Sequence, residues 1–422
     1  MKDYLFDNVH NGVHLYSSIT IEDQPHIPPN QPSALQHYDI VNKMLNEELA
    51  MGRIAGPFQT RPPGLIISPL AAVPKKDPGS YRIIHNLSFP LGNSVNSHTP
   101  RELCSVSYET IDDCIDIVTK LGKNCLISKI DVLKSFRIIR VAEYDLRFLG
   151  FMWNDSFWID LVMPMGASIS CSHFERLSTA LQWIAINKLH VPYISHILDD
   201  FIFFGPPQSQ VCKNSLLAFQ SLADSVGIPL NPKKTVQPST SVELHGILFD
   251  TVEMRLKVPQ DKREKALKLI QQMKIKTKVT LDEIQKLTGL LQFLTKAIQP
   301  GRSFLRRLYD LTRTLYLPTH LVRLNAEAKR DLEAWEIFLK DFQGSLMLKS
   351  IDWHRDSHWK LFSDASGKGY GAMYGHKWIQ GEFPPNWSKK SIAIRELVPV
   401  YLSFQLWVET FPNSKILLIT LQ

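Results

Sequence analysis

Residues 193–205 read YISHILDDFIFFG, and place Asp199 and Asp200 side by side in an otherwise apolar run. The aromatic and β-branched flanks predict two half-buried strands that meet at the acidic pair. Two like charges this close repel each other, and in a partly dry site one takes up a proton unless a cation lies between them. A divalent metal ion is one candidate for that cation. The alternative is a solvated hairpin tip.

A second acidic pair, Asp112 and Asp113 in YETIDDCIDIVTKLG, favours a purely structural interpretation. Thr110 is a good N-cap, and Asp113 falls in the first turn, where a carboxylate meets the positive end of the helix dipole. The apolar residues recur at helical spacing: Ile111, Cys114, Ile115, Val118 and Leu121. This pair therefore predicts a helix start, whereas the pair at 199–200 has no such pattern after it.

Length and charge point to several domains and a polyanionic partner. A chain of 422 residues is too long for one compact core. The formal net charge is +7, but residues 255–313 alone contain 15 Lys and Arg against 5 Asp and Glu. A local basic excess of this kind most often indicates nucleic acid. The alternative is a pair of solvated helices with Lys-rich outer faces.

The cysteines and the N-terminal segment indicate an intracellular protein. The chain has five cysteines, with neither a CxxC pair nor metal-ligand spacing to His. We interpret them as reduced thiols. The segment MKDYLFDNVHNGV lacks an apolar stretch of signal-peptide length, and no uncharged apolar run is long enough to span a bilayer. We expect a soluble protein without a membrane partner, in the cytoplasm, the nucleus or both.

Four regions follow one another along the chain. Residues 1–33 end in the Pro-rich QPHIPPNQPS and predict an extended or disordered arm. Residues 34–253 mix helices and strands, beginning with a helix from Ala34 to about Gly52. Residues 254–345 are basic and helical, with a capping box at Thr280 and Glu283. Residues 346–422 return to strands followed by a helix, so the expected fold class is α+β.

Several further segments contain candidate functional residues, and their order along the chain is informative. Asp131 ends the apolar strand of LISKIDVLKSFRIIRV, and Phe136 follows five residues later. Pro164 and Gly166 then interrupt LVMPMGASISCSHFERL before a helix. In this order the segments resemble a reverse transcriptase. The sequence is most similar to the pol region of DIRS-type (tyrosine-recombinase) retrotransposons, from SVSYETIDD through the GPP after the acidic pair to PGRSFLRRL.

The resemblance implies a right-hand polymerase with fingers and palm in 34–253 and a thumb and connection in 254–345. It would be an RNA-directed DNA polymerase that extends a DNA primer along an RNA or DNA template with deoxynucleoside triphosphates. Two metal ions stabilise the attacking and leaving oxygens in such a reaction. Mg²⁺ is expected, with Mn²⁺ as an alternative. Asp131 and Asp199 would bridge both metals, and Asp200 would be a weaker partner.

The resemblance also assigns roles outside the metal site. Lys75 and Arg82 would bind the triphosphate, and Phe136 would be a steric gate against the ribose 2′-OH. Gly166 would let the backbone approach the nucleotide closely, and Lys234 would be a proton donor. The primer grip would be Leu244, His245 and Gly246. Each has an ordinary alternative, such as a solvated charge for Lys75, core packing for Phe136 and a turn for Gly166.

Three positions depart from the pattern of reverse transcriptases. Ile197 stands where Tyr is common, Met165 where retroviral relatives have Gln, and Lys134 where many relatives have a small or acidic residue. These departures put fidelity and rate in doubt, but not metal binding.

Residues 346–422 resemble a partial RNase H-like α/β domain. Asp364 ends the strand KLFSD, and Glu396 lies near the start of a helix. Leu421 stands where relatives carry a further carboxylate, so we expect ribonuclease H activity to be absent or very weak. The alternative is a degenerate remnant that only caps the connection.

Two other functions remain open, and two partners follow from the resemblance alone. The chain is either the proposed polymerase, a catalytically inactive nucleic-acid-binding remnant of a mobile element, or an RNA–DNA hybrid ribonuclease. The three palm carboxylates argue against a remnant, and Leu421 argues against a nuclease. The implied partners are the tyrosine recombinase and the Gag-like protein of the element.

Overall fold

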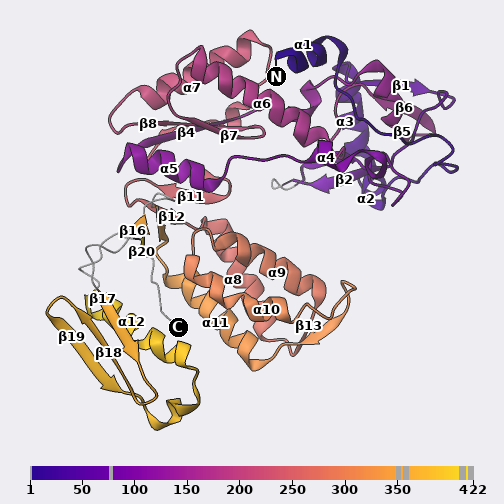
Figure 1. Cartoon of the computed structure of the whole chain (residues 1–422). Coiled ribbons are helices and arrows are strands. Elements are labelled where there is room, and N and C mark those ends of the chain that lie inside the picture. Colours follow the sequence, from indigo (N-terminus) through magenta and orange to yellow (C-terminus); the bar gives the residue numbers. More distant parts are fainter. Residues whose placement is uncertain (1, 76–78, 348–352, 355–360, 408–414, 417–422) are drawn as a thin grey trace. The chain divides into compact units, whose positions relative to one another are not determined.

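The computed structural model describes residues 2–75, 79–347, 353–354, 361–407 and 415–416 (Figure 1). The chain forms two compact units, Met1–Asp113 with Leu121–Val242 and Cys114–Lys120 with Glu243–Gln422. The division near residue 242 comes before the expected boundary at 253, which stays a prediction. None of the helices in these described ranges has both the length and the apolar character needed to cross a bilayer.

The helix α5 (Ile111–Leu121) begins as its sequence predicts. Thr110 donates its backbone N–H and its hydroxyl to the Asp113 carboxylate, at 2.7 and 2.8 Å, and its hydroxyl accepts from the Asp113 N–H at 3.4 Å. The helix start at the first acidic pair is therefore confirmed. The pair at 199–200 lies in a different setting.

The second acidic pair lies at one end of a four-stranded antiparallel sheet of the first unit, in the order β7-β8-β4-β9. Asp131 is directly opposite Asp200 in the register of β4 and β8. Helices α6 and α7 pack against this sheet around Phe174, Phe201 and Phe219. The bounds are β4 (Leu126–Asp131), β7 (Ile194–Ile197), β8 (Asp200–Gly205), β9 (Val236–Ser239), α6 (Ser170–Asn187) and α7 (Val211–Ser225). Residues 201–205 are all buried, so β8 is more buried than we expected.

A three-stranded sheet and a separate hairpin complete this unit. The sheet has the order β1-β6-β5, and the hairpin pairs β2 with β3. The helix expected from Ala34 is in fact two helices, α2 and α3, with His37 between them. The bounds are β1 (Ile54–Phe58), β2 (Leu70–Pro74), β3 (Tyr81–His85), β5 (Gly150–Trp153), β6 (Ser156–Asp160), α2 (Pro32–Gln36), α3 (Tyr38–Ala50) and α4 (Arg101–Cys104).

The N-terminal arm, predicted to be extended or disordered, consists of a helix and an extended segment. Residues Lys2–Asn11 form helix α1, and the extended segment after it buries the side chains of Val13, Leu15 and Ile19 in a core cluster. The Asp145 carboxylate accepts the backbone N–H of Leu15 at 2.7 Å. The burial of these apolar side chains stabilises the extended segment.

The basic region of the second unit is helical, as predicted. A small sheet has the strand order β10-β11-β12-β15. Its first three strands come before helices α8 to α11 in the sequence, and β15 comes after them. Helix α9 carries the predicted capping box of Thr280 and Glu283. The bounds are β10 (Ser241–Leu244), β11 (Ile247–Asp250), β12 (Arg255–Lys257), β13 (Lys278–Thr280), β14 (Leu321–Arg323), β15 (Ser345–Leu346), α8 (Gln260–Lys274), α9 (Leu281–Leu294), α10 (Arg306–Asp310) and α11 (Ala326–Asp341).

The C-terminal region of the second unit forms an antiparallel three-stranded sheet packed with a helix. The sheet has the order β17-β18-β19, and α12 contacts each of its strands. The bounds are β16 (Trp353–His354), β17 (Leu361–Ala365), β18 (Gly369–Tyr374), β19 (Lys377–Glu382), α12 (Ile392–Trp407) and β20 (Lys415–Ile416). The expected strands and the expected helix of this region are present.

Candidate active site

Two of the three palm carboxylates line one cavity of about 340 Å³. Asp131 is the last residue of β4, and Asp199 lies in the turn between β7 and β8. Asp200 does not line this cavity, and its carboxylate pairs with the Lys129 ammonium at 3.3 Å. The structure therefore brings Asp131 and Asp199 together and turns Asp200 toward a cation on β4.

The negative charges of the carboxylates are only partly compensated by nearby cations. Asp131 is 4% exposed; one of its oxygens accepts from Lys234 Nζ at 2.7 Å and the other from Asn231 Nδ2 at 3.1 Å. Burial, together with the charges of Asp131 and Asp200, raises the pKa of Asp199 to about 6. Lys234 lowers this pKa only in part, so the pair still favours a further cation.

The donor set fits a magnesium ion at Asp131 and Asp199. Carboxylate oxygens are the hard ligands that Mg²⁺ prefers, and a bound cation would relieve the repulsion between the two groups. Within the described ranges, no three Asp, Glu, His or Cys side chains already converge on one point. Asp200 would have to leave Lys129 before it could join such a site.

The raised pKa predicts that the metal-free protein is less stable at neutral pH. Asp199 keeps its proton to about pH 6 in the folded protein, whereas its ordinary pKa is 3.8. This contribution to stability is therefore present at low pH and is lost as the pH rises from about 4 through about 6. In EDTA, the Tm of the wild type should fall between pH 4.5 and 7 by more than that of Asp199→Asn. Equal falls in the two proteins would contradict the assignment, and added Mg²⁺ should restore the Tm at pH 7.

A pair of side chains on α6 holds the turn that carries the acidic pair. Leu198 has a φ of +51°, an uncommon backbone conformation for a residue of this type. Its N–H donates to the Glu175 carboxylate at 3.0 Å, and its carbonyl accepts from the Ser178 hydroxyl at 2.7 Å. Glu175 is 8% exposed and also pairs with His196 at 3.2 Å. Our sequence analysis missed this support, although a glutamate among the apolar residues of 170–187 could have signalled it.

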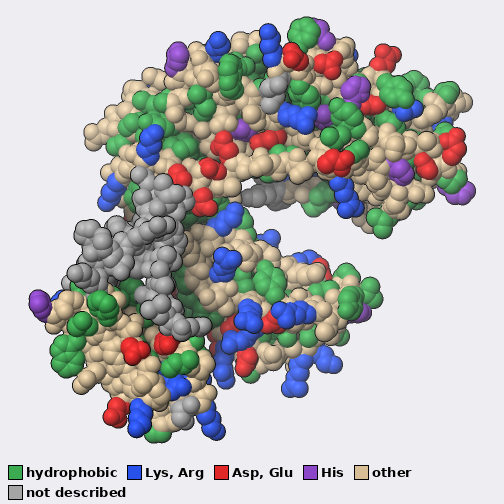
Figure 2. All heavy atoms as spheres, viewed as in Figure 1, with side chains coloured by type: hydrophobic (Ala, Val, Ile, Leu, Met, Phe, Trp, Pro, Cys, Tyr) green, Lys and Arg blue, Asp and Glu red, His purple; other side chains and the backbone are tan. Residues whose placement is uncertain are grey.

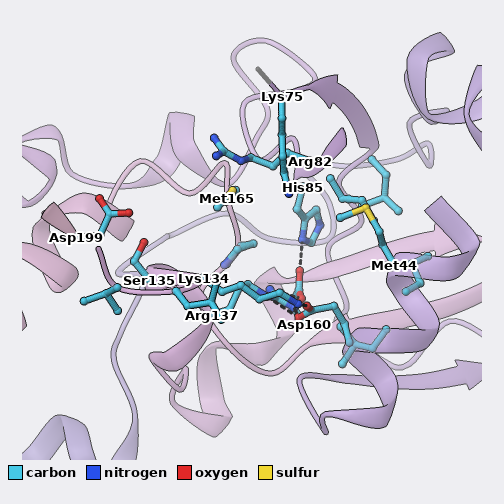
Figure 3. A pocket seen from close by; sticks show the side chains of 18 of the residues that line it. Met44, Lys75, Arg82, His85, Lys134, Ser135, Arg137, Asp160, Met165 and Asp199 are labelled. Carbon is cyan, nitrogen blue, oxygen red and sulfur yellow. Dashed lines mark hydrogen bonds and ion pairs between the residues drawn. The ribbon is translucent and has the colours of Figure 1, made fainter. Parts of the chain in front are cut away.

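The cavity walls carry cations from distant segments (Figure 3). Lys75 and Arg82 line it from the β2–β3 hairpin, and Lys234 lines it beside Asp131, so these three predicted residues do share one cavity. Lys75 donates its backbone N–H to Ser80 at 2.8 Å, which closes the hairpin end. No carboxylate pairs with Lys75 or Arg82 in the part of the chain that the structure describes. Both side chains are exposed toward solvent.

A buried ion network underlies the same cavity and was also missed. The Arg137 guanidinium lies 2.7 Å from Asp160 and 3.0 Å from Glu48. Burial alone would lower the pKa of Arg137, but these two carboxylates raise it. Asp160 is in addition 2.9 Å from His85 Nδ1. A charged residue at the end of an apolar strand, as in YRIIH and SFWID, was the available signal, because a buried charge needs a partner.

Phe136, expected at the sugar of the nucleotide, and Gly166, expected to let the backbone approach the nucleotide or template, are not among the residues that line the cavity. Gly166 has a φ of +131°, and a Cβ atom built on it would lie 2.0 Å from the His85 carbonyl oxygen. Phe136 packs edge-on against Phe174, with ring centroids 5.9 Å apart, whereas Ser135 on the same turn lines the cavity. The steric-gate role of Phe136 therefore stays a prediction beside its packing role.

The residues expected at the primer end form the turn between β10 and β11 in the second unit. Leu244 is buried, and His245 and Gly246 have φ angles of +47° and +78°. The Gly246 carbonyl accepts from Lys262 Nζ of α8 at 2.7 Å. The turn is thus tied to the helical region, and its role at a primer stays a prediction.

Some of the positive charge of the basic helices is compensated by ion pairs with acidic residues. Figure 2 shows Lys and Arg mixed with Asp and Glu on the visible face of α8–α11. Acidic residues of α11 pair with this segment, at 2.9 Å for Lys274 with Glu336 and 2.7 Å for Arg307 with Asp331. Lys residues on the exposed side of α8, such as 265 and 268, make no ion pair within the described ranges.

The predicted RNase H-like residues lie on neighbouring elements. Asp364 on β17 is opposite Gly371 of β18. Glu396 is on α12, at helical spacing from the buried Val400, Ser403 and Trp407. Glu396 therefore shares the face of α12 that packs inward. Leu421 lies outside the described residues.

Comparison with known proteins identifies the domain. Residues 73–249 match the family model "Reverse transcriptase (RNA-dependent DNA polymerase)". This part of the chain is therefore similar to a reverse transcriptase domain. This match supports the predicted enzyme class, an RNA-directed DNA polymerase. No curated protein sequence matches the chain.

Three solved structures of foamy viral protease-reverse transcriptase are similar in fold, each with 19% sequence identity. The first, the dRH form in complex with double-stranded DNA, has a TM-score of 0.60 and is matched over 96% of this chain and 65% of that chain. The second, also with double-stranded DNA, has a TM-score of 0.56 over 93% and 74%. The third, with an RNA/DNA hybrid, has a TM-score of 0.59 over 97% and 52%. The right-hand polymerase fold expected from the sequence is thus confirmed, and the chain spans about half to three quarters of these proteins.

Proposed function

We propose that this chain extends a DNA primer along an RNA or DNA template with deoxynucleoside triphosphates. The observation that carries the proposal is the single cavity that Asp131 and Asp199 share with Lys75, Arg82 and Lys234. The match of residues 73–249 and the nucleic acids named for the similar structures support it. Such an enzyme would meet its substrates in the cytoplasm or the nucleus.

The side chains divide the work of nucleotidyl transfer. Two Mg²⁺ ions would activate the primer hydroxyl and stabilise the leaving pyrophosphate when bound at the carboxylates. Asp131 and Asp199 would hold them, because their oxygens face one cavity. Lys75 and Arg82 would bind the triphosphate through charge-assisted hydrogen bonds. Lys234, whose ammonium already lies 2.7 Å from Asp131, would donate a proton to the departing pyrophosphate.

We assign the chain to a DIRS-type retrotransposon on its sequence resemblance alone. A tyrosine recombinase and a Gag-like protein would then be its partners. Asp364 and Glu396 would contribute an RNase H-like site, but Leu421 replaces a carboxylate that two-metal hydrolysis needs, so we propose that its ribonuclease activity is weak.

Primer extension tests the function. The purified chain would be incubated with a labelled DNA primer on RNA and on DNA templates, with deoxynucleotides and Mg²⁺ or EDTA. Mg²⁺-dependent extension is expected. Binding without extension would favour an inactive remnant, and degradation of the RNA strand without extension would favour a ribonuclease.

A further inference from the structure

Lys134 occupies a strained position directly after the strand of Asp131. Its φ and ψ are 54° and 44°, the left-handed region, in which a lysine is uncommon. Two backbone hydrogen bonds of 2.8 Å fix this turn, from Leu133 N–H to the Pro229 carbonyl and from Arg137 N–H to the Lys134 carbonyl. Strain of this kind persists where the surrounding structure holds it, often at functional sites. The turn delivers the Lys134 side chain to the wall of the cavity (Figure 3).

One carboxylate, that of Glu48, serves three cations at this wall. It lies 2.8 Å from Lys134 Nζ, 3.0 Å from Arg137 and 3.6 Å from Arg53. Arg137 also has Asp160 as a partner at 2.7 Å. Of these three cations, Lys134 and Arg137 line the cavity, whereas Arg53 lies outside its lining. Burial alone would raise the pKa of Glu48, but Lys134 and Arg137 lower it, so Glu48 stays ionised.

Lys134 is the member of this group that can leave. Its side chain is 37% exposed, whereas those of Arg137 and Glu48 are 12% and 14% exposed. Its departure would not strand a buried charge, because Glu48 would keep Arg137 and Arg53. A lysine ammonium on its flexible stem can also reorient more freely than the doubly paired guanidinium of Arg137.

We propose that Lys134 is a phosphate-binding residue of the nucleotide site. When a triphosphate enters the cavity, the ammonium leaves Glu48 and binds phosphate oxygens together with Lys75 and Arg82, which line the same cavity. The ligand is a di- or triphosphate group, because Lys75 and Arg82 line the same cavity without a carboxylate partner among the described residues and can bind phosphate oxygens. This inference rests on the polymerase function proposed above.

Lys134→Gln tests the proposal in two assays on the full chain. The KM for deoxynucleotides should rise by about tenfold with kcat within about twofold, since a charge-assisted hydrogen bond made to substrate and transition state alike is lost. The affinity for inorganic pyrophosphate, measured by calorimetry without primer, should fall by about tenfold. Lys233→Gln is the matched control, because Lys233 is exposed and lies outside the cavity lining; both values should match the wild type.

Glu48→Gln separates phosphate binding from a merely structural ion pair. If the only role of Lys134 is its ion pair with Glu48, then Lys134→Gln and Glu48→Gln weaken pyrophosphate binding alike, and the proposal fails. If Lys134 binds phosphate, then Glu48→Gln leaves that affinity unchanged or improves it. An unaltered pyrophosphate affinity in Lys134→Gln would also overturn it. Loss of pyrophosphate affinity in Lys134→Gln, in a chain that extends no primer, would instead refute the polymerase function and keep the phosphate site.

Discussion

Asp199→Asn is expected to reduce primer extension by at least about a thousandfold, or ~4 kcal/mol in the barrier. The change removes one of the two carboxylates in the shared cavity and leaves the size of the side chain almost unaltered. The same change removes a charge that Asp131 and Asp200 oppose. The Tm at pH 7 without metal should therefore stay equal or rise. Activity would fall while the Tm stays equal or rises. A variant that lost activity by unfolding would instead show a lower Tm.

The other acidic pair supplies the matched control. Asp112→Asn makes the same change in the same dipeptide, but at the exposed start of α5. It should leave extension within about twofold and cost less than about 1 kcal/mol, since only a helix-dipole interaction is weakened. Gel-based extension and thermal unfolding measure both effects. Extension retained in Asp199→Asn, or lost in both variants, would refute the assignment of the carboxylate.

Gly166→Ala is expected to destabilise the protein by about 2–4 kcal/mol and to reduce extension by at least about a hundredfold. The added methyl group would lie 2.0 Å from the His85 carbonyl oxygen, at a backbone φ of +131°. Relief requires β3 to shift, and β3 also carries Arg82 into the cavity. A small displacement of a phosphate-binding side chain is enough to slow transfer strongly.

Gly227→Ala separates the steric clash from backbone strain. Gly227 also has a positive φ, +71°, but no atom lies within 4 Å of the position of its Cβ. Its substitution should cost only about 1–2 kcal/mol, from the backbone alone, and leave the rate per folded molecule unchanged. Calorimetric unfolding and extension rates measure the difference. Equal behaviour of the two alanine variants would show that the contact with His85 is not what restricts residue 166.

The sequence predicted those features that depend on neighbours in the chain. The caps at Thr110 and Thr280 were predictable, because each uses a side chain and an acceptor three residues apart. The strands around Asp199 were predictable for the same reason, since hydrophobic and β-branched residues are contiguous there. The convergence of Asp131 and Asp199 could be expected only from the resemblance to a known family, because no local pattern relates strands this far apart.

The parts that sequence reasoning missed depend on contacts between distant segments. Glu48, Arg137 and Asp160 come from three different elements, and only the folded cavity shows that they share charges. The burial of the N-terminal segment depends on distant residues in the same way. Its composition predicts an extended or disordered arm, whereas Val13, Leu15 and Ile19 pack in a core cluster formed mainly by residues 141–169.

The hold of α6 on Leu198 has a consequence for how this site can evolve. Glu175 and Ser178 form hydrogen bonds with the backbone of Leu198, and its side chain takes no part in these bonds. The geometry of the neighbouring acids is thereby insulated from the identity of the residues just before them. Substitutions at residue 197 or 198 should therefore change the position of the acidic pair less than substitutions of Glu175 or Ser178 do.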